Sequence, residues 1–470
     1  MNENPQATFE QLGEYVEAQL KAKGVPGAAV GLLYGGETYS AGFGVTSVEN
    51  PLPVTPETLF QIGSITKTFT CLALMRLVEQ NKVDLEATVR TYLPEFKVAD
   101  EAASAHAKVW HLLTHVAGWV GDLFDDTGCE ADALANYVAK MADLEQLAPL
   151  GQVWSYNNAS FGLAGYLIEQ VTGQLYETAI QELVFEPLGL KRCFLDAGNV
   201  ISFRFAVGHA VEDGTAKVLR PWPLPRYARS MGGIVTDVGD LLRYAQFQMG
   251  DGKAAAGEDA ADGDVGGEEA EPVQIVQPDT LVQMHAPKLN RWGEKEQMGL
   301  AWFINDVGGT RQLSHGGGTL GQISLLCFFP EHKTALAVLT NATEGGAITD
   351  GVRRWVLEHY LGIEDKKPEP VEATEDELAE YVGFYSRPMS DFELGLLNGR
   401  LVGQMVIKQG FPSKEMPPPP PPPPSALAPC GKDRLLIVAG PNKGGTVDVI
   451  RKEDGSIGWL RAGRIHRKVR

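Results

Sequence analysis

Two groups of strand-like segments, lying far apart in the chain, most constrain how this sequence can fold. The first is an apolar run at residues 28–34, followed by a Gly35-Gly36 turn and a returning segment that ends at Val45. A two-glycine turn between such runs is typical of a β-hairpin. The second group has four segments, at residues 299–304, 311–315, 322–329 and 334–339. We predict that both groups pair into one antiparallel sheet, an α/β architecture whose halves are not contiguous in sequence.

Helical patterns lie before, between and after these strands. An amphipathic helix is predicted at residues 8–23, because its apolar residues recur at spacings of three and four. A second helix, at residues 64–81, is apolar on nearly all sides and is therefore expected to be buried. Further helices are predicted at residues 110–114, 131–139, 160–171, 176–184, 238–249 and 348–361. The expected fold is an antiparallel sheet flanked by helices, with a mainly helical insertion.

A charged, proline-containing linker at residues 364–376 divides the chain into two predicted domains, residues 1–363 and residues 377–470. The second domain alternates strand patterns with glycine-rich turns, which predicts a small antiparallel β-barrel. Its expected strands are residues 381–385, 392–397, 400–407, 434–438, 446–451 and 457–465. We find no catalytic constellation in the sequence of this domain.

Two low-complexity segments are predicted to be insertions. Residues 251–271 are rich in Gly, Ala and acidic residues, which is typical of a disordered surface loop. A metal site there is disfavoured, because the acids lack the spacing of a cation-binding loop. Residues 412–429 include eight consecutive prolines, which favour a stiff polyproline II segment. The alternative to a loop insertion is an adaptor segment that recruits an SH3-like partner.

The composition argues against nucleic acid and membranes as partners. The 41 basic and 60 acidic side chains give a formal net charge of −19, which repels nucleic acid and anionic lipid. No apolar run is long enough to span a membrane and the N-terminus lacks a leader pattern, so we expect a cytoplasmic protein. The five cysteines form no C-x-x-C pair, which favours reduced thiols over disulfides or zinc. We expect no metal and no organic cofactor.

Ser64 and Lys67 lie three residues apart at the start of the buried helix. On a helix, this spacing places both side chains on one face, one turn apart. A serine hydroxyl is a weak nucleophile unless a neighbouring group takes its proton, and a buried lysine is one group that does so. The free N–H groups of the helix start also favour negative charge near Ser64. Alone, the S-x-x-K pattern is common, and an ordinary serine and a solvated lysine would match it equally well.

Two further segments carry residues suited to acyl transfer. Tyr156 and Asn158 lie in a loop before the helix at residues 160–171; a phenolate is a competent general base, and an amide can bind a substrate carbonyl. His315 precedes Gly316-Gly317-Gly318 at the end of a strand, where the N–H of Gly318 could join that of Ser64 as an oxyanion hole.

The glycine-rich segment matches two other motifs only superficially. Residues 316–321 fit G-x-G-x-x-G, but a strand pattern follows where a dinucleotide-binding fold needs a helix. Residues 315–318 resemble a lipase oxyanion segment, but the chain contains no G-x-S-x-G elbow.

Taken in order, these motifs resemble those of the penicillin-recognising serine hydrolases, the superfamily of serine β-lactamases and penicillin-binding proteins. The three motifs are Ser-x-x-Lys at 64–67, Tyr-x-Asn at 156–158 and His-x-Gly at 315–317. The second is most similar to the branch of class C β-lactamases, D-alanyl-D-alanine carboxypeptidases, D-aminopeptidases and β-lactamase-like esterases. Segments 111–118, 185–190 and 231–236 are also similar to family signposts, and the resemblance covers residues 8–362.

The resemblance implies a role for each motif residue. Ser64 would be the acylated nucleophile, Lys67 would shuttle a proton or stabilise charge, and Tyr156 would be the general base and acid. Substrate would be bound by Asn158, His315, Gly317 and Gly318. The expected fold is thus β-lactamase-like, and the C-terminal domain resembles the lipocalin-like barrels appended to some family members.

The implied function is a serine hydrolase that acts on a small ester, amide or short peptide. A carboxylesterase or a D-amino-acid-type peptidase is favoured over a β-lactamase, because His315 stands where many β-lactamases have lysine. A neutral imidazole holds a substrate carboxylate less firmly than an ammonium group. The alternatives are a β-lactamase, an acyltransferase and, from another class, a non-catalytic scaffold or filament-forming relative. A homo-oligomer is also an expectation.

An acidic loop is a further candidate for the border of the cleft. It contains Asp122, Asp125 and Asp126 beside Trp119 and Phe124. The loop is a candidate for contact with substrate, and no chemical step is assigned to it.

Overall fold

The computed structural model describes residues 4–254, 272–410 and 417–470. The chain forms two compact units, each built from segments that are discontinuous in sequence. The first unit comprises Met1–Ala87, Gly128–Leu134 and Phe161–Asp365, and the second Thr88–Thr127, Ala135–Ser160 and Lys366–Arg470. Part of the predicted helical insertion therefore groups with the C-terminal barrel. The predicted domain boundaries themselves stay a prediction.

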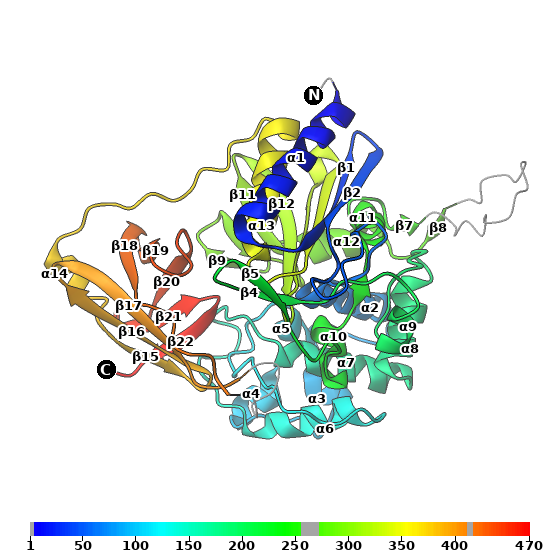
Figure 1. The fold of residues 1–470 in the computed structure, drawn as a ribbon. Helices are drawn as coiled ribbons and strands as arrows, with labels where there is room; N and C mark the ends of the chain where they lie inside the picture. The colour runs from blue at the N-terminus through cyan, green and yellow to red at the C-terminus, as the bar shows by residue number, and fades with distance from the viewer. Residues whose placement is uncertain (1–3, 255–271, 411–416) are drawn as a thin grey trace, which may run out of the picture. The chain divides into compact units, whose positions relative to one another are not determined.

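An eight-stranded antiparallel sheet organises the first unit (Figure 1). In spatial order its strands are β2 (Glu37–Gly44), β1 (Gly27–Tyr34), β14 (Thr334–Thr340), β13 (Ile323–Phe329), β12 (Thr310–Gly318), β11 (Phe303–Val307), β10 (Glu296–Met298) and β9 (Leu289–Trp292). Strands β1 and β14 are adjacent, with Val30 opposite Val338, so the predicted pairing of the two distant groups is confirmed. The predicted hairpin is confirmed as well, because Gly35 and Gly36 both have positive φ between β1 and β2.

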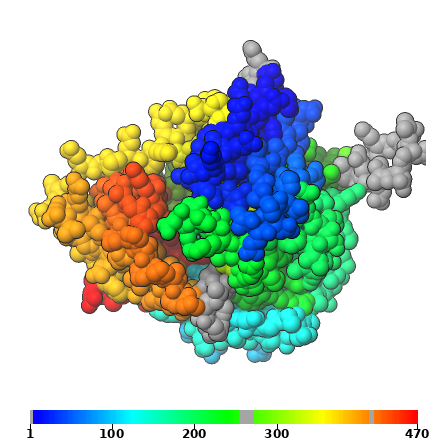
Figure 2. Space-filling view, in the orientation of Figure 1, coloured from blue at the N-terminus to red at the C-terminus, as the bar shows by residue number. Residues whose placement is uncertain are grey.

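Helices cover both faces of this sheet. Every residue of its central strands β1 and β14 is therefore buried. On one face, the apolar stripe of α1 (Pro5–Lys23) packs with α13 (Gly345–Val356) against the strands; Figure 2 shows α1, in dark blue, on the outside of the unit. Against the other face lies α11 (Val238–Gln248), where Leu242 and Val238 approach Gly31 of β1 so closely that a Cβ there would lie within 3.0 Å of both. Burial of apolar surface on both faces thus fixes the sheet between two helical layers.

The first unit contains further short elements. Its other helices and helical turns are η1 (Gly63–Ile65), α2 (Thr66–Glu79), α8 (Tyr176–Ile180), η3 (Gln181–Phe185), α9 (Ala197–Val200), η4 (Arg226–Ala228), α10 (Arg229–Gly232), α12 (Pro278–His285), η5 (Pro330–His332) and η6 (Leu357–Leu361). Its small strands pair as β3 (Phe60–Gln61) with β6 (Val235–Thr236), β4 (His209–Glu212) with β5 (Thr215–Val218), and β7 (Lys253–Ala254) with β8 (Val273–Gln274).

A closed eight-stranded barrel forms most of the second unit, which confirms the predicted barrel. Its strands are β15 (Gly383–Arg387), β16 (Ser390–Leu397), β17 (Arg400–Ile407), β18 (Ser425–Gly431), β19 (Arg434–Ala439), β20 (Thr446–Arg451), β21 (Ile457–Ala462) and β22 (Arg464–Lys468). Tyr385, Leu401, Leu435 and Leu460 are nearly or fully buried in its core. The helices are α3 (Val89–Tyr92), α4 (Glu101–His106), α5 (Val109–Leu113), η2 (Met141–Asp143) and α14 (Glu375–Ala379), while α6 (Ala133–Lys140) and α7 (Ala159–Thr172) span segments of both units.

Local backbone geometry explains where predicted strands were wrong. The strand predicted at residues 299–304 starts only at Phe303, because Ala301 has φ of +61°, which no strand residue adopts. The single strand predicted at residues 457–465 is two, β21 and β22, because Gly463 has φ of +71° and turns the chain between them.

The two predicted insertions lie partly outside the described residues. Residues 255–271 of the acidic segment and residues 411–416 beside the proline run are not described. The strand β18 begins at Ser425, inside the range 412–429. Among the described residues, no helix has both the length and the apolar character needed to cross a bilayer.

Candidate functional site

The first motif lies at the start of α2 in the first unit. Ser64 is in the helical turn η1, which runs directly into α2, and the side chain of Lys67 is fully buried. Lys67 Nζ donates to Ser64 Oγ at 3.0 Å and to the carbonyl oxygen of Met231 at 2.6 Å. The structure therefore brings together the hydroxyl and the amine that the S-x-x-K spacing predicts on one helix face.

The third motif faces the first from strand β12. Gly317 passes so close to the chain before Ser64 that a Cβ on it would lie 1.9 Å from the carbonyl oxygen of Ile62. A Cβ on Gly63, whose φ is +51°, would lie 2.6 Å from the backbone nitrogen of Gly318. Only glycine permits this approach of two backbones. The backbones around Ser64 and Gly318, which are the predicted oxyanion-hole donors, are therefore neighbours within the first unit.

His315 is buried at the end of the same strand, and its Nδ1 lies 2.6 Å from the carbonyl oxygen of Gly316. Burial, with the Lys67 cation adding to it, lowers the pKa of His315 to about 3. The imidazole is therefore neutral at physiological pH. The third motif supplies a polar group without a positive charge, as the sequence predicts.

The close approach at Gly317 leads to a stability prediction. Gly317→Ala is expected to reduce the free energy of unfolding by about 2 kcal/mol or more, because β12 must move away from Ile62. The neighbouring Gly316→Ala is the matched control, since its Cβ would lie 3.6 Å from Ser324 in ordinary contact. Urea unfolding of both variants measures the difference; equal effects at the two positions would contradict the packing argument.

The neutral state of His315 leads to a prediction about pH. Because its pKa is near 3 in the folded protein and near 6.5 when unfolded, the unfolded state binds more protons between these values. The contribution of His315 to stability is therefore complete above pH 6.5 and is lost as the pH falls toward 3. We expect the unfolding free energy of wild type relative to His315→Gln to decline over this window, by up to about 1.4 kcal/mol per pH unit. A difference that is constant with pH would contradict the prediction.

The second motif lies in the second unit, in the loop between Trp154 and α7. The backbone N–H of Tyr156 donates to the carbonyl oxygen of Gly463 at 3.0 Å, and that of Asn158 donates to Gly121 at 2.9 Å. The ring of Tyr156 lies 4.3 Å from the ring of His115, centroid to centroid. These contacts hold the loop that presents both predicted side chains.

Two charged residues next to this motif, Arg387 and Arg464, were not recognised in the sequence. The carboxylate of Asp122, only 3% exposed, accepts hydrogen bonds from Asn158 Nδ2 at 2.8 Å and from Arg464 and Arg387 of the barrel at 2.8 and 2.9 Å. The guanidinium carbon of Arg464 lies 5.0 Å from the centroid of the Tyr156 ring. The sequence signals the acidic loop, but it does not predict that the loop is held by arginines more than two hundred residues later. Asp122 is engaged in these contacts instead of lining an open border.

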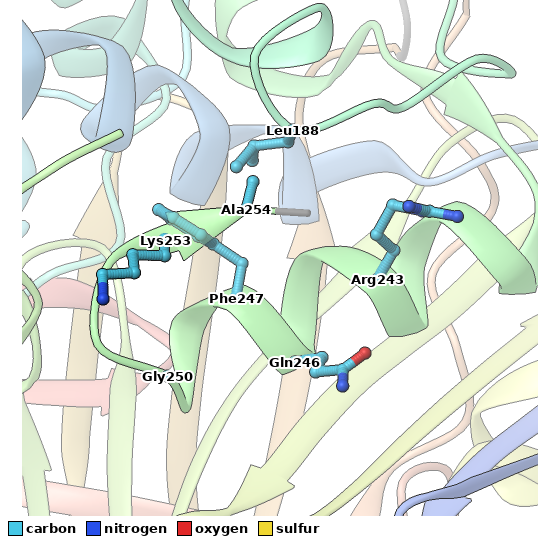
Figure 3. Close-up of a pocket in the computed structure, with 7 residues that line it drawn as sticks. All are labelled: Leu188, Arg243, Gln246, Phe247, Gly250, Lys253 and Ala254. Atoms are coloured by element: carbon cyan, nitrogen blue, oxygen red, sulfur yellow. The ribbon is translucent and has the colours of Figure 1, made fainter. Parts of the chain in front are cut away.

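One cavity of the first unit lies at the end of α11 and has a volume of about 270 Å³. Figure 3 shows its lining residues Leu188, Arg243, Gln246, Phe247, Gly250, Lys253 and Ala254. Of the predicted site residues, all of which are described, none lines it. The adjacent strand β7 leads into residues outside the described part of the chain, so the cavity carries no functional assignment.

Comparisons with known proteins identify relatives over most of the chain. A family model described as "Beta-lactamase" matches residues 12–361. A curated relative, penicillin-binding protein 4 of Amycolatopsis lactamdurans, is 30% identical over 370 residues, covering 77% of this chain and 93% of its own.

Solved structures share the fold at lower sequence identity. The crystal structure of SurE is 22% identical, covers 98% of this chain and 99% of its own, and has a TM-score of 0.76. The octameric penicillin-binding protein homologue from Pyrococcus abyssi is 23% identical, covers 98% and 100%, and has a TM-score of 0.65. EstCE1, titled a hydrolase with promiscuous acyltransferase activity, is 22% identical, covers 74% and 98%, and has a TM-score of 0.61. The motif residues, the sheet and the family match lead to one conclusion: this chain belongs to the beta-lactamase family.

Proposed function

We propose that the protein is a serine hydrolase that forms an acyl-enzyme on Ser64 and hydrolyses an ester or amide. The observation that carries the proposal is the 3.0 Å hydrogen bond from Lys67 Nζ to Ser64 Oγ, made by a lysine that is fully buried. A buried amine held against a hydroxyl is a known way to activate a serine nucleophile. A scaffold protein has no physical need for such a pair, which argues against the non-catalytic alternative.

In the proposed mechanism, Ser64 Oγ attacks the substrate carbonyl carbon while its proton passes to the phenolate of Tyr156, either directly or through Lys67. The N–H groups of Ser64 and Gly318 bind the resulting oxyanion, because partial positive charge there stabilises the tetrahedral intermediate. Tyr156 then donates a proton to the departing alcohol or amine, and the carbon–leaving-group bond breaks. A water molecule, deprotonated by Tyr156, then attacks the acyl carbon. The bond between this carbon and Ser64 Oγ breaks, Ser64 Oγ takes the proton from Tyr156, and the acid is released.

The remaining predicted residues would bind substrate in this mechanism. Asn158 would hydrogen-bond the acyl portion, and Gly317 would allow the substrate to approach the edge of β12. His315 would offer a neutral hydrogen-bonding group. Its neutral charge favours an ester or a D-amino-acid-type peptide over a β-lactam, whose carboxylate would gain more from a cation. No metal or organic cofactor enters any proposed step.

The choice of substrate class is open to direct test. Within the family, the relatives include β-lactamases, such as that of Providencia stuartii, and this supports a β-lactamase as the second candidate. SurE has been crystallised with D-Leu, which is a reason to include D-amino-acid peptides. EstCE1, by its title, is a reason to include acyl transfer to added alcohols or amines.

The test is a panel of p-nitrophenyl acetate, nitrocefin and D-alanine p-nitroanilide, each with wild type and Ser64→Ala. We expect turnover of the ester or the D-amino-acid amide that is faster than that of nitrocefin and absent in Ser64→Ala. Faster nitrocefin turnover would replace the proposal by the β-lactamase alternative. No turnover of any substrate, together with no acyl adduct, would favour the scaffold alternative.

Self-association and a cytoplasmic location remain proposals. The octameric homologue from Pyrococcus abyssi is a reason to measure the molar mass in solution by light scattering. A multiple of 50.8 kDa is the expected result, and a mass equal to one chain would contradict it.

A further inference from the structure

The barrel is joined to the loop of the second motif by two hydrogen bonds that involve backbone atoms on either side of Arg464. Gly463 accepts the N–H of Tyr156 at 3.0 Å, and the N–H of Ile465 donates to Ser155 Oγ at 3.2 Å. Arg464 lies between these two anchors, at the first position of β22. The backbone of Arg464 is therefore fixed on both sides, and its side chain is held by the carboxylate of Asp122.

Asp122 contacts three side chains of this region, those of Asn158, Arg387 and Arg464. Burial alone would raise the pKa of its carboxyl, but Arg464 and Arg387 outweigh burial and lower the pKa to about 2. The carboxylate therefore remains ionised at every pH at which the enzyme would be assayed. It accepts hydrogen bonds from both arginines and from Asn158 Nδ2. The last contact orients the amide of Asn158, so that its oxygen is the end left to accept a substrate N–H.

The charges of the cluster do not cancel. Two guanidinium groups surround one carboxylate, so one positive charge remains in excess beside Tyr156. The guanidinium carbon of Arg464 lies 5.0 Å from the centroid of the Tyr156 ring, and the two side chains interact electrostatically. In general, a cation next to a phenol favours its ionised form.

We propose that Asp122 is a positioning residue of the proposed hydrolase: it holds the amide of Asn158 and locks Arg464 of the barrel beside Tyr156. The inference rests on the proposed function and extends it, because it makes the barrel a structural part of the second motif. In the described part of the unit, further titratable or charged groups near Tyr156 include His115 against its ring, Arg387 beside Asp122, and Arg461, which lies over Trp154. A positioning residue acts through the side chains it holds and does not itself touch substrate.

The test compares two variants with two matched controls. Asp122→Asn keeps the shape of the side chain and removes its charge, while Arg464→Met removes the cation. The controls are Asp433→Asn, a barrel carboxylate paired with Arg451, and Arg467→Met, which lies on β22 and contacts Glu145 and Gln146. For the fastest substrate of the panel, kcat is expected to fall about 10- to 100-fold in the two variants, with a smaller change in KM. The controls are expected to stay within about threefold of wild type.

A second readout separates electrostatics from simple loss of structure. In Arg464→Met, the acidic limb of the pH–rate profile is expected to move upward by about one pH unit, because the phenolate loses a neighbouring cation. Arg464→Lys restores the positive charge but not the planar guanidinium group that binds Asp122. The acidic limb of the pH–rate profile should therefore return toward that of wild type, while kcat stays reduced. Melting temperatures show which variants are folded. If Asp122→Asn does not fold, the acidic limb and kcat of Arg464→Lys, compared with those of Arg464→Met, test whether the cation beside Tyr156 is required.

A third readout does not depend on turnover. Fluorotyrosine incorporated at position 156 reports the ionisation of this phenol by ¹⁹F NMR, and its midpoint should rise in Arg464→Met and not in Arg467→Met. An equal midpoint in all variants, or equal kcat in variants and controls, would overturn the inference while Ser64-dependent turnover persists. Absence of turnover in wild type would overturn the proposed function instead, and the fluorine titration would still decide the role of the cluster.

Discussion

Lys67→Met is expected to slow acylation of Ser64 by about 10³-fold or more, although the nucleophile itself is intact. The physical reason is the loss of the amine that lies 3.0 Å from Ser64 Oγ. Methionine has nearly the same length and suits a fully buried site, so the fold should persist. Stopped-flow measurement of the acylation phase with p-nitrophenyl acetate gives the rate directly.

Lys82→Met is the matched control for this experiment. Lys82 is exposed and lies just beyond the end of α2, so its removal takes one positive charge from the same helix region without affecting the Ser64 pair. Acylation in this variant is expected to be within about twofold of wild type. A Lys67→Met protein that is folded and acylates as fast as the control would show that the amine has no role in activating the serine.

Tyr156→Phe is expected to reduce kcat by about 10²- to 10⁴-fold, the range typical of a lost general acid–base group. The substitution removes one hydroxyl and keeps the ring that packs against His115 and lies beside Arg464. Both acylation and deacylation should slow, because the proposed mechanism uses the phenol in each step. Single-turnover and burst kinetics separate the two phases.

The control for Tyr156→Phe is another tyrosine of the same unit. Tyr137 is buried and its hydroxyl donates to the carbonyl oxygen of Leu123 at 3.2 Å. Tyr137→Phe should lower stability by about 1 kcal/mol and leave kcat near that of wild type. If both variants lost activity in proportion to their loss of stability, Tyr156 would be a structural residue and the proposed general base would have to be sought elsewhere.

The sequence predicts the sheet well because its strands carry strong local signals. The apolar run of β1 and the Gly35-Gly36 turn define a hairpin without reference to the rest of the chain. The pairing of β1 with β14 follows from burial, since two mostly apolar strands that are buried along their whole length must be covered by neighbours. The pair of Ser64 and Lys67 is likewise local, because one helical turn brings the side chains together.

Features that depend on a single backbone angle or on distant contacts could not be predicted. Ala301 adopts positive φ although nothing in its side chain favours that conformation, and it shortens the strand expected there. Asp122 and Arg464 meet only because the barrel closes and its β21–β22 turn reaches the loop of Tyr156. No hydrophobic periodicity or motif spacing in the sequence indicates a contact between residues so far apart. The barrel sequence by itself therefore predicts no catalytic residue.

The central claim is that Ser64 becomes covalently acylated. Intact-protein mass spectrometry after brief exposure to p-nitrophenyl acetate, and separately to a β-lactam, tests it most directly when Ser64→Ala is treated in parallel. We expect a mass increase of one acyl group in wild type, located by peptide mapping on the peptide that contains Ser64, and no increase in Ser64→Ala. An adduct that persists in Ser64→Ala, or turnover that is unchanged by this substitution, would contradict the account.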